Sequence, residues 1–219
     1  APGFLNIPAP SKSPAESIDK ALKELETDYL DLYLIHAPWL RLDLLHGYDI
    51  EKAWKELVEA KKAGKVRHIG VSNFAWPHLE QTFAAAGDKA FYPEVNQIEF
   101  HPYLQNQLYK INEFCKKHGI LVEAFAPLAP LWRVKDGDKE ITDHPLTKIL
   151  PGLATKYNKT EAQILLRYTL QKDILPITTS SKPQRIHESL AIYEFELEDD
   201  DVALIDTEGA KFNFRGFFD

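Results

Sequence analysis

The sequence predicts an α/β protein built around a parallel β-sheet. Five short segments rich in apolar, β-branched and aromatic residues are each followed by a stretch with helical periodicity. The expected strands are 29–36, 66–71, 94–98, 120–125 and 174–178. They are nearly continuous apolar runs rather than alternating patterns, as expected when both faces of a sheet are covered. Strict alternation of strand and helix implies that the strands are parallel.

Capping signals define several of the expected helices. Ser13 with Glu16, and Thr160 with Gln163, have the spacing of a capping box at a helix N-terminus. Gly119 follows an apolar stripe and is expected to end a helix. The expected helices begin near residues 13, 50, 79, 108, 144, 160, 183 and 198, and 126–143 is expected to be irregular.

Two architectures fit this alternation, an open doubly wound sheet and part of a (β/α)8 barrel. An open sheet that binds a dinucleotide is expected to carry the pattern Gly-x-Gly-x-x-Gly after a strand, and the sequence lacks it. A complete barrel needs about 250 residues and eight strand–helix units. The barrel interpretation therefore requires three further units before residue 1. The absence of methionine agrees with a chain that begins at a cut.

Composition excludes several classes of partner. A net charge of −7 argues against binding to nucleic acid or to an acidic membrane surface. The single cysteine, Cys115, rules out an intramolecular disulfide and fits a reducing, cytoplasmic compartment. It lies in a helical pattern, which favours a packing role. No apolar run reaches the roughly 18 residues of a membrane span, and the first residues lack the features of a signal peptide.

The strand 29–36 delivers His36 to its C-terminal end. In α/β proteins the carboxyl ends of strands are where ligands bind and reactions occur. A histidine there can exchange a proton near neutral pH or polarise a carbonyl group. Taken alone, such a residue more often makes only a local hydrogen bond. The other histidines do not show the spacing of metal ligands, so we expect no metal site.

Four motifs occur in a fixed order along the chain. They are LIHAP at 34–38, GKVRHIGVSNF at 64–74, VNQIEFHP at 95–102 and FAPL at 125–128. In order and spacing they resemble the aldo-keto reductase family, from the fourth strand of its barrel to its C-terminal tail. The segments 11–14, 97–102 and 178–182 look most like a fungal branch that reduces conjugated polyketones, such as ketopantoyl lactone, and α-keto amides.

The resemblance implies a (β/α)8 TIM barrel, of which residues 1–219 form strands 4–8 and the tail as a single domain. It implies an NADPH-dependent oxidoreductase that reduces an α-dicarbonyl, a ketolactone or an α-keto amide to the alcohol. The family's catalytic tetrad is Asp, Tyr, Lys and His. His36 matches the histidine, which orients and polarises the carbonyl, and the other three would precede residue 1. The chain alone is therefore expected to be inactive, and the full-length protein a cytoplasmic monomer or dimer.

The resemblance also implies a site for the nicotinamide end of NADPH. Ser72, Asn73 and Gln97 match side chains that hydrogen-bond the carboxamide, which needs donors and acceptors at fixed positions. Phe125 matches the aromatic residue on which the ring stacks. The stretch 126–143 matches the loop that covers the cofactor. The first residues of this loop, at the pyrophosphate, are Ala126, Pro127 and Leu128.

The 2′-phosphate site of the family falls at the start of a helix, where hydroxyl groups, backbone N–H groups and a guanidinium can surround a phosphate. The matching residues are Thr179, Ser180, Ser181, Lys182 and Arg185, and Glu188 is expected to meet the adenine. The family places a lysine before the serine, whereas Thr179 stands there in this chain and Lys182 comes later. This departure bears on the choice of NADP over NAD.

Simpler interpretations stay open for several of these residues. Ser72 could serve only as an N-cap, and Arg185 could be a solvated charge. Trp39 and Tyr103 are candidates for the substrate pocket beside the tail 209–219, although loop aromatics more often pack. Two other functions remain open. One is a non-catalytic NADP-binding barrel subunit, and the other is an inactive piece whose exposed strand edges pair with a complementary part.

Overall fold

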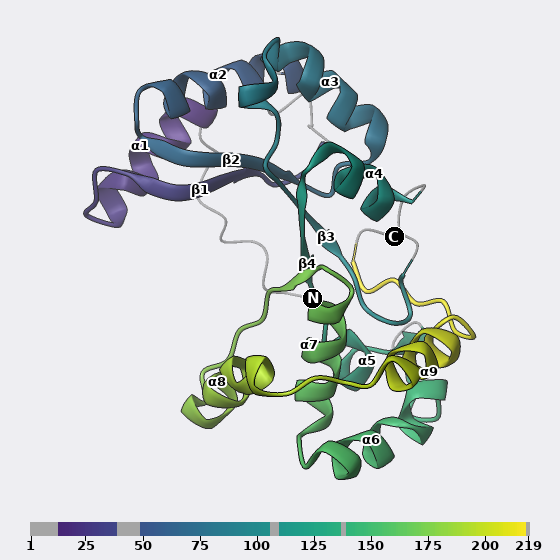
Figure 1. Ribbon diagram of the computed structural model, residues 1–219. Coiled ribbons are helices and arrows are strands. Elements are labelled where there is room, and N and C mark those ends of the chain that lie inside the picture. Colours follow the sequence, from purple (N-terminus) through teal and green to yellow (C-terminus); the bar gives the residue numbers. More distant parts are fainter. Residues whose placement is uncertain (1–12, 39–48, 106–109, 137–138, 218–219) are drawn as a thin grey trace. The chain divides into compact units, whose positions relative to one another are not determined.

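A computed structural model of the protein describes residues 13–38, 49–105, 110–136 and 139–217. All five expected strands form, and their hydrogen-bonded order is β1-β2-β3-β4-β7. They are β1 Leu30–Ile35, β2 Val66–Ser72, β3 Val95–Glu99, β4 Leu121–Phe125 and β7 Leu175–Pro176 (Figure 1). The pairs β1–β2 and β4–β7 are parallel, as predicted. The chain forms two compact units, 1–96 and 97–219, and β3 crosses the boundary between them.

Helices of the first unit cover β1 and β2. They are α1 Pro14–Glu24, α2 Ile50–Lys62 and α3 Trp76–Ala86, followed by the short 3-10 helix η1 Lys89–Phe91. In this unit α2 packs against α1, α3 and β2 (Figure 1). The fully buried Trp54 fixes α2, because its indole N–H donates to the carbonyl of Phe91 at 3.1 Å. Ser13 caps α1 as predicted, its hydroxyl accepting from the backbone N–H of Glu16 at 3.1 Å.

Gly70 marks a close backbone approach within the first unit. A Cβ atom built at Gly70 would lie 2.6 Å from the carbonyl oxygen of Val95 and 2.7 Å from a methyl carbon of Leu34. The backbone of Val95 cannot move aside as a flexible side chain can. Strand β2 therefore needs a glycine at residue 70, where it lies against the start of β3.

The second unit contains the remaining elements. They are α4 Ile111–His118, α5 Ala129–Trp132, β5 Lys135–Asp136, β6 Lys139–Glu140, the 3-10 helix η2 Pro145–Lys148, α6 Leu150–Tyr157, α7 Glu161–Gln171, α8 Pro183–Leu190, the 3-10 helix η3 Ala191–Glu194 and α9 Asp199–Gly209. Thr160 and Gln163 form the predicted capping box at the start of α7. The stretch 126–143, expected to be irregular, instead holds α5 and the antiparallel pair β5–β6.

Prolines explain two further differences from the expected elements. The helix expected from residue 144 begins as η2, and regular α-helix starts only at Leu150, because Pro151 lacks the N–H that would continue an i→i−4 ladder through this point. Strand β7 has two residues, the second of which is Pro176, which cannot donate to the sheet. The backbone N–H of Ile177 adds one more bond, to the carbonyl of Ala124 at 2.8 Å.

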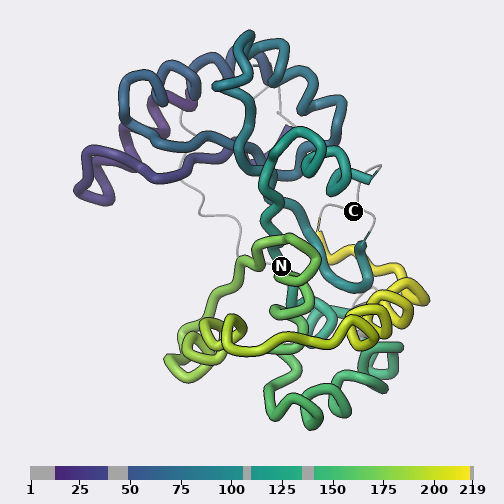
Figure 2. Tube along the Cα trace, in the orientation of Figure 1, coloured from purple at the N-terminus to yellow at the C-terminus, as the bar shows by residue number. Residues whose placement is uncertain are grey.

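One face of α7 binds the backbone of α8 and of the chain that follows it. Gln163 and Arg167 lie four residues apart, so their side chains project from the same face of the helix. The amide of Gln163 donates to the carbonyl of Glu188 at 3.0 Å, and Nη1 of Arg167 donates to the carbonyl of Ile192 at 3.1 Å. Figure 2 shows this yellow-green segment running from α8 towards α9.

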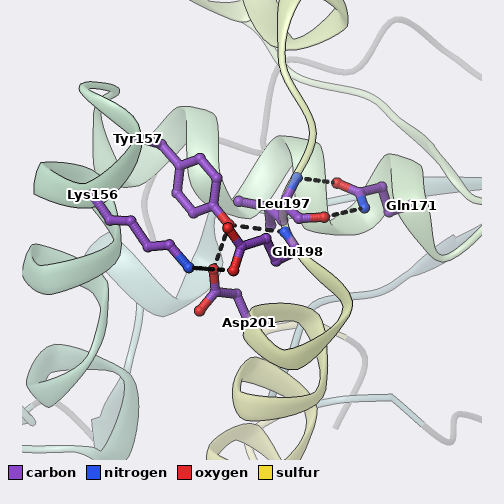
Figure 3. Close-up of polar contacts among 6 residues, drawn as sticks. All are labelled: Lys156, Tyr157, Gln171, Leu197, Glu198 and Asp201. Atoms are coloured by element: carbon purple, nitrogen blue, oxygen red, sulfur yellow. Dashed lines mark hydrogen bonds and ion pairs between the residues drawn. The ribbon is translucent and has the colours of Figure 1, made fainter.

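Gln171, four residues further along α7, completes the row. Its Oε1 accepts from the N–H of Leu197 at 2.8 Å, and its Nε2 donates to the carbonyl of Leu197 at 3.0 Å (Figure 3). A single side chain thus satisfies both backbone groups of one residue, much as a neighbouring strand would. The row of three polar side chains fixes the backbone from the last turn of α8 to the residues before α9 relative to α7.

A polar cluster anchors the first turn of α9 to the end of α6 (Figure 3). The Lys156 ammonium lies 2.7 Å from a carboxylate oxygen of Glu198 and 2.8 Å from one of Asp201. The hydroxyl of Tyr157 donates to Asp201 and accepts from the backbone N–H of Glu198 at 2.8 Å. The carboxylates of Glu198 and Asp201 at the start of α9 are therefore both bound by groups at the end of α6.

This cluster makes part of the stability dependent on pH. Partial burial alone raises the pKa of Asp201, but hydrogen bonds from Lys156 and Tyr157 outweigh it and hold the pKa below its ordinary value. A carboxyl group with a lowered pKa stabilises the fold above its unfolded pKa, and that stabilisation is lost as pH falls through the folded pKa. The relevant window lies below about pH 4.

We therefore expect Asp201→Asn to lower the melting temperature at about pH 7 and to have a smaller effect at about pH 3. Thermal unfolding followed by circular dichroism across this range measures the difference. The exposed neighbour Asp200 supplies the control, because Asp200→Asn removes a charge from the same turn. An equal effect of Asp201→Asn at both pH values would show that the pKa of Asp201 is not lowered in the folded protein.

Candidate functional site

The second unit contains a cavity of about 740 Å³ at the carboxyl ends of β4 and β7. Parallel strands end at the same edge of a sheet, so the loops that follow them meet there. After β4 the chain turns at Ala126, whose φ of +54° lies in the left-handed region. The cavity is lined by residues 125–129 and 131–133, the start of α7, residues 177–180, one face of α8 and Phe217.

Eight of the residues that the resemblance assigned to NADPH line this one cavity. They are Phe125, Ala126, Pro127, Leu128, Thr179, Ser180, Arg185 and Glu188. Segments about fifty residues apart in the sequence are thus brought together by the β4–β7 pairing. Ser181 and Lys182 are exposed beside the lining, at the start of α8.

The polar end of the cavity lies at the N-terminus of α8. The Ser180 hydroxyl accepts from the backbone N–H of Lys182 at 3.1 Å, which shapes the turn into the helix. Arg185 is exposed, and its guanidinium lies 5.8 Å from the centre of the Trp132 ring across the cavity lining. Hydroxyl groups, the positive end of a helix dipole and a guanidinium are therefore gathered in one place, a combination suited to an anionic group.

The apolar end of the cavity holds a pair of phenylalanines. The rings of Phe125 and Phe217 lie 5.4 Å apart at 82°, an edge-to-face contact. The guanidinium of Arg133 lies 4.7 Å from the centre of the Phe217 ring. Phe125 was predicted as a site residue, whereas Phe217 was missed. The only signal for Phe217 in the sequence is the aromatic character of the tail.

Gln97, also predicted to bind the cofactor, is half-buried on β3 of the second unit. Its Nε2 donates to a carboxylate oxygen of Glu123 at 2.8 Å, and Glu123 is itself buried on β4. This contact is typical of a strand residue that bonds to its neighbour on the next strand, and it orients the side chain of Gln97.

Three predicted residues meet in the first unit at the ends of β1 and β2. The Asn73 amide donates to the backbone carbonyl of His36 at 3.0 Å and to the hydroxyl of Ser72 at 3.0 Å. Ser72 and Asn73 are buried, and Asn73 has a φ of +60°, which asparagine tolerates better than most residues. The imidazole of His36 is exposed. Asn73 therefore ties the His36 backbone down while leaving its side chain open to a ligand.

The two candidates for the substrate pocket have different outcomes. Trp39 lies outside the described residues. Tyr103 is buried, its hydroxyl lying 2.5 Å from Nδ1 of His144 and accepting from the N–H of Leu146 at 2.8 Å. Burial raises the pKa of Tyr103 to about 12, so the phenol stays neutral. These contacts are those of a packing residue.

The described residues contain neither a group of metal ligands nor a helix that could span a membrane. Within the described ranges, no three His, Cys, Asp or Glu side chains are grouped so that they could hold a metal ion. Among the helices in these same ranges, none has the length and apolar character needed to cross a bilayer.

Known proteins resemble the chain in sequence. A model described as the aldo/keto reductase family matches residues 9–208. The NADPH-dependent alpha-keto amide reductase of Saccharomyces cerevisiae is 45% identical over 192 residues, which make up 88% of this chain and 59% of that protein. The NAD/NADP-dependent indole-3-acetaldehyde reductase of Schizosaccharomyces pombe is 36% identical over 206 residues, which are 92% of this chain and 67% of that protein.

Solved structures resemble the chain as well. An aldo-keto reductase of Bombyx mori in complex with NADP superposes with a TM-score of 0.78 at 29% identity. The superposition covers 92% of this chain and 65% of that one. The chain therefore spans about three fifths to two thirds of the relatives that it matches.

Proposed function

Because the chain belongs to the aldo/keto reductase family, we propose that this protein is an NADPH-dependent reductase of small carbonyl compounds. The observation that carries the proposal is the 740 Å³ cavity, which gathers residues assigned to the pyrophosphate and the 2′-phosphate of one cofactor. The five strands correspond in this proposal to the last five of the family's TIM barrel.

Within the second unit, we assign the phosphate groups to the polar end of the cavity. Thr179, Ser180 and the N-terminus of α8 offer hydroxyl and backbone donors, and the Arg185 guanidinium offers charge. Glu188 lines the cavity one helical turn further along α8, where an adenine amino group would meet it. Phe125 offers an apolar ring to the nicotinamide at the opposite end.

Within the first unit, we assign the substrate carbonyl to the exposed imidazole of His36 and the nicotinamide carboxamide to Ser72 and Asn73. Bound NADPH would supply the hydride. The role of His36 is to donate a hydrogen bond to the carbonyl oxygen, which favours the charge that develops there on reduction. The name of the yeast relative favours an α-keto amide or a similar α-dicarbonyl as substrate.

Arg185 provides the sharpest test of the cofactor assignment. If its guanidinium binds the 2′-phosphate, we expect Arg185→Ala to weaken NADPH binding about 10- to 100-fold, the equivalent of losing charge-assisted hydrogen bonds. NADH, which lacks this phosphate, should bind nearly as before. Fluorescence titration with both nucleotides measures the ratio.

The control for this test is Arg67→Ala, which removes an exposed arginine paired with Asp31 in the first unit. Equal losses of NADPH and NADH binding in Arg185→Ala would contradict the 2′-phosphate role. Failure of the unaltered protein to bind NADPH at all would overturn the proposed function itself. Reduction of an α-keto amide or of ketopantoyl lactone by the full-length protein, followed by NADPH absorbance, tests the reaction.

A further inference from the structure

A buried carboxylate holds the C-terminal tail of the second unit. Glu99, at the end of β3, is 1% exposed. One of its oxygens accepts from the backbone N–H of Gly216 at 2.7 Å, and the other accepts from the N–H of Phe217 at 3.2 Å. Nε2 of His101, which is 0% exposed, lies 3.2 Å from the first oxygen. Two successive amides thus clasp one carboxylate across more than a hundred residues of sequence.

The tail is shaped for this clasp. A Cβ atom added to Gly216 would lie 3.1 Å from the Glu99 carboxylate and 3.4 Å from the ring of Phe214. The same tail is fixed further back, where the N–H of Phe214 donates to the carbonyl of Tyr103 at 3.2 Å. A side chain at residue 216 would push the two amides away from the carboxylate, so glycine permits the close approach.

The clasp determines where the Phe217 ring lies. Its backbone N–H is bound to Glu99, and its ring contacts Phe125 at a centroid distance of 5.4 Å within the cavity lining. Aromatic rings in direct contact have centroids about 4.5–7 Å apart, so no third ring fits between these two. A planar ligand that stacks on Phe125 from this side must therefore displace Phe217.

We propose that Glu99 is a positioning residue that latches the C-terminal tail, so that the Phe217 ring covers Phe125 and competes with the planar ring of a bound ligand. The tail is thus a cover of the site, and Glu99 sets how readily it lifts. The inference rests on the proposed function only in taking the nicotinamide of NADPH as that ring.

Hydrogen exchange tests the latch without any ligand. In Glu99→Gln the carboxamide keeps one acceptor oxygen and turns an N–H2 group toward the tail, so one of the two amide bonds is lost. We expect the Gly216 and Phe217 amides to exchange about tenfold faster in this variant. The exposed Glu80 gives the control Glu80→Gln, which should leave their exchange unchanged. Unchanged exchange in Glu99→Gln would overturn the proposal.

NADPH titration of the full-length protein tests the competition. We expect Phe217→Ala, which removes the ring but keeps the clasp, to bind NADPH about three- to tenfold more tightly, the equivalent of one aromatic pair. Glu99→Gln should shift affinity in the same direction. Unchanged or weaker binding in Phe217→Ala would overturn the proposal, since Phe217 would then be a wall of the site.

Phe212 supplies the matched control, because it lies in the same tail and its ring packs 5.0 Å from that of Tyr103. A gain in affinity in Phe212→Ala as large as that in Phe217→Ala would also overturn the proposal, by showing general loosening of the tail. If the unaltered protein does not bind NADPH, the proposed function fails. The exchange measurement still decides whether Glu99 latches the tail.

Discussion

Replacing His36 by alanine is expected to lower kcat/KM for a carbonyl substrate by about 10²- to 10³-fold in the full-length protein. The proposed role is donation of a hydrogen bond to the carbonyl oxygen, and loss of one such donor typically has an effect of this size. The dissociation constant for NADPH should stay the same, because the assigned cofactor contacts are made by other side chains. Steady-state kinetics and a separate binding titration distinguish the two quantities.

The geometry allows His36→Ala to remove the imidazole without disturbing the surrounding structure. The contact between Asn73 and His36 uses the His36 backbone carbonyl, which alanine retains. The imidazole itself is exposed, so its removal opens no cavity in the core. The end of β1 should therefore keep its position, and the melting temperature should change little. A loss of activity can then be attributed to the missing imidazole.

Two further variants sharpen the test. His36→Gln keeps a hydrogen-bond donor on the side chain, so it should recover part of the activity. His68→Ala removes an exposed histidine from the neighbouring strand β2 and should leave kcat/KM unchanged. Full activity in His36→Ala would rule out the carbonyl-orienting role.

Much of the fold could be predicted because it depends on local signals. The apolar runs, the caps at Ser13 and Thr160, and the glycine at residue 119 each act within a few residues of sequence. The row formed by Gln163, Arg167 and Gln171 could not be predicted in this way. Each of these side chains binds backbone about 25 residues away, and nothing in a helical pattern distinguishes such a residue from a solvated one.

The residues of the candidate site also fall into a predictable group and an unpredictable group. Phe125 and Thr179 were assigned to one cofactor through the resemblance to the family, and both line one cavity because parallel strands bring the loops that follow them to one edge. Phe217 and Glu99 could not, since their contacts join the tail to β3 across the whole second unit. Tyr103 fits the packing alternative that the sequence left open, because it is buried as completely as an aromatic residue in a strand.

Arg167→Ala is expected to lower the free energy of unfolding by about 2–4 kcal/mol, because a buried carbonyl loses its donor and a packed side-chain stem is removed. The side chain is 9% exposed. Its guanidinium donates to the side chain of Gln171 at 3.0 Å, to the carbonyl of Ile192 at 3.1 Å and to the carboxylate of Glu196 at 2.8 Å. Alanine would leave unfilled space beside α7, and it would leave the carbonyl of Ile192 in η3 without this donor.

The three contacts are not expected to contribute equally. The Glu196 side chain is 82% exposed, so its ion pair is screened by water and should contribute at most about 1 kcal/mol. Most of the loss in Arg167→Ala should come from the buried stem and the bond to the Ile192 carbonyl. We therefore expect Glu196→Gln to cost less than about 1 kcal/mol in urea unfolding. Equal effects of the two substitutions would show that the ion pair dominates.

Arg167→Ala should also affect the candidate site. Gln163 binds the backbone of α8 at Glu188, and Arg167 binds the backbone of η3, which directly follows α8, at Ile192. Since α8 carries Arg185, a looser α8 should place its guanidinium less well against a 2′-phosphate. We expect Arg167→Ala to narrow the preference for NADPH over NADH, and Glu196→Gln to leave it intact. If Arg167→Ala destabilises the fold without changing this preference, α8 is held in place by its other contacts with α7.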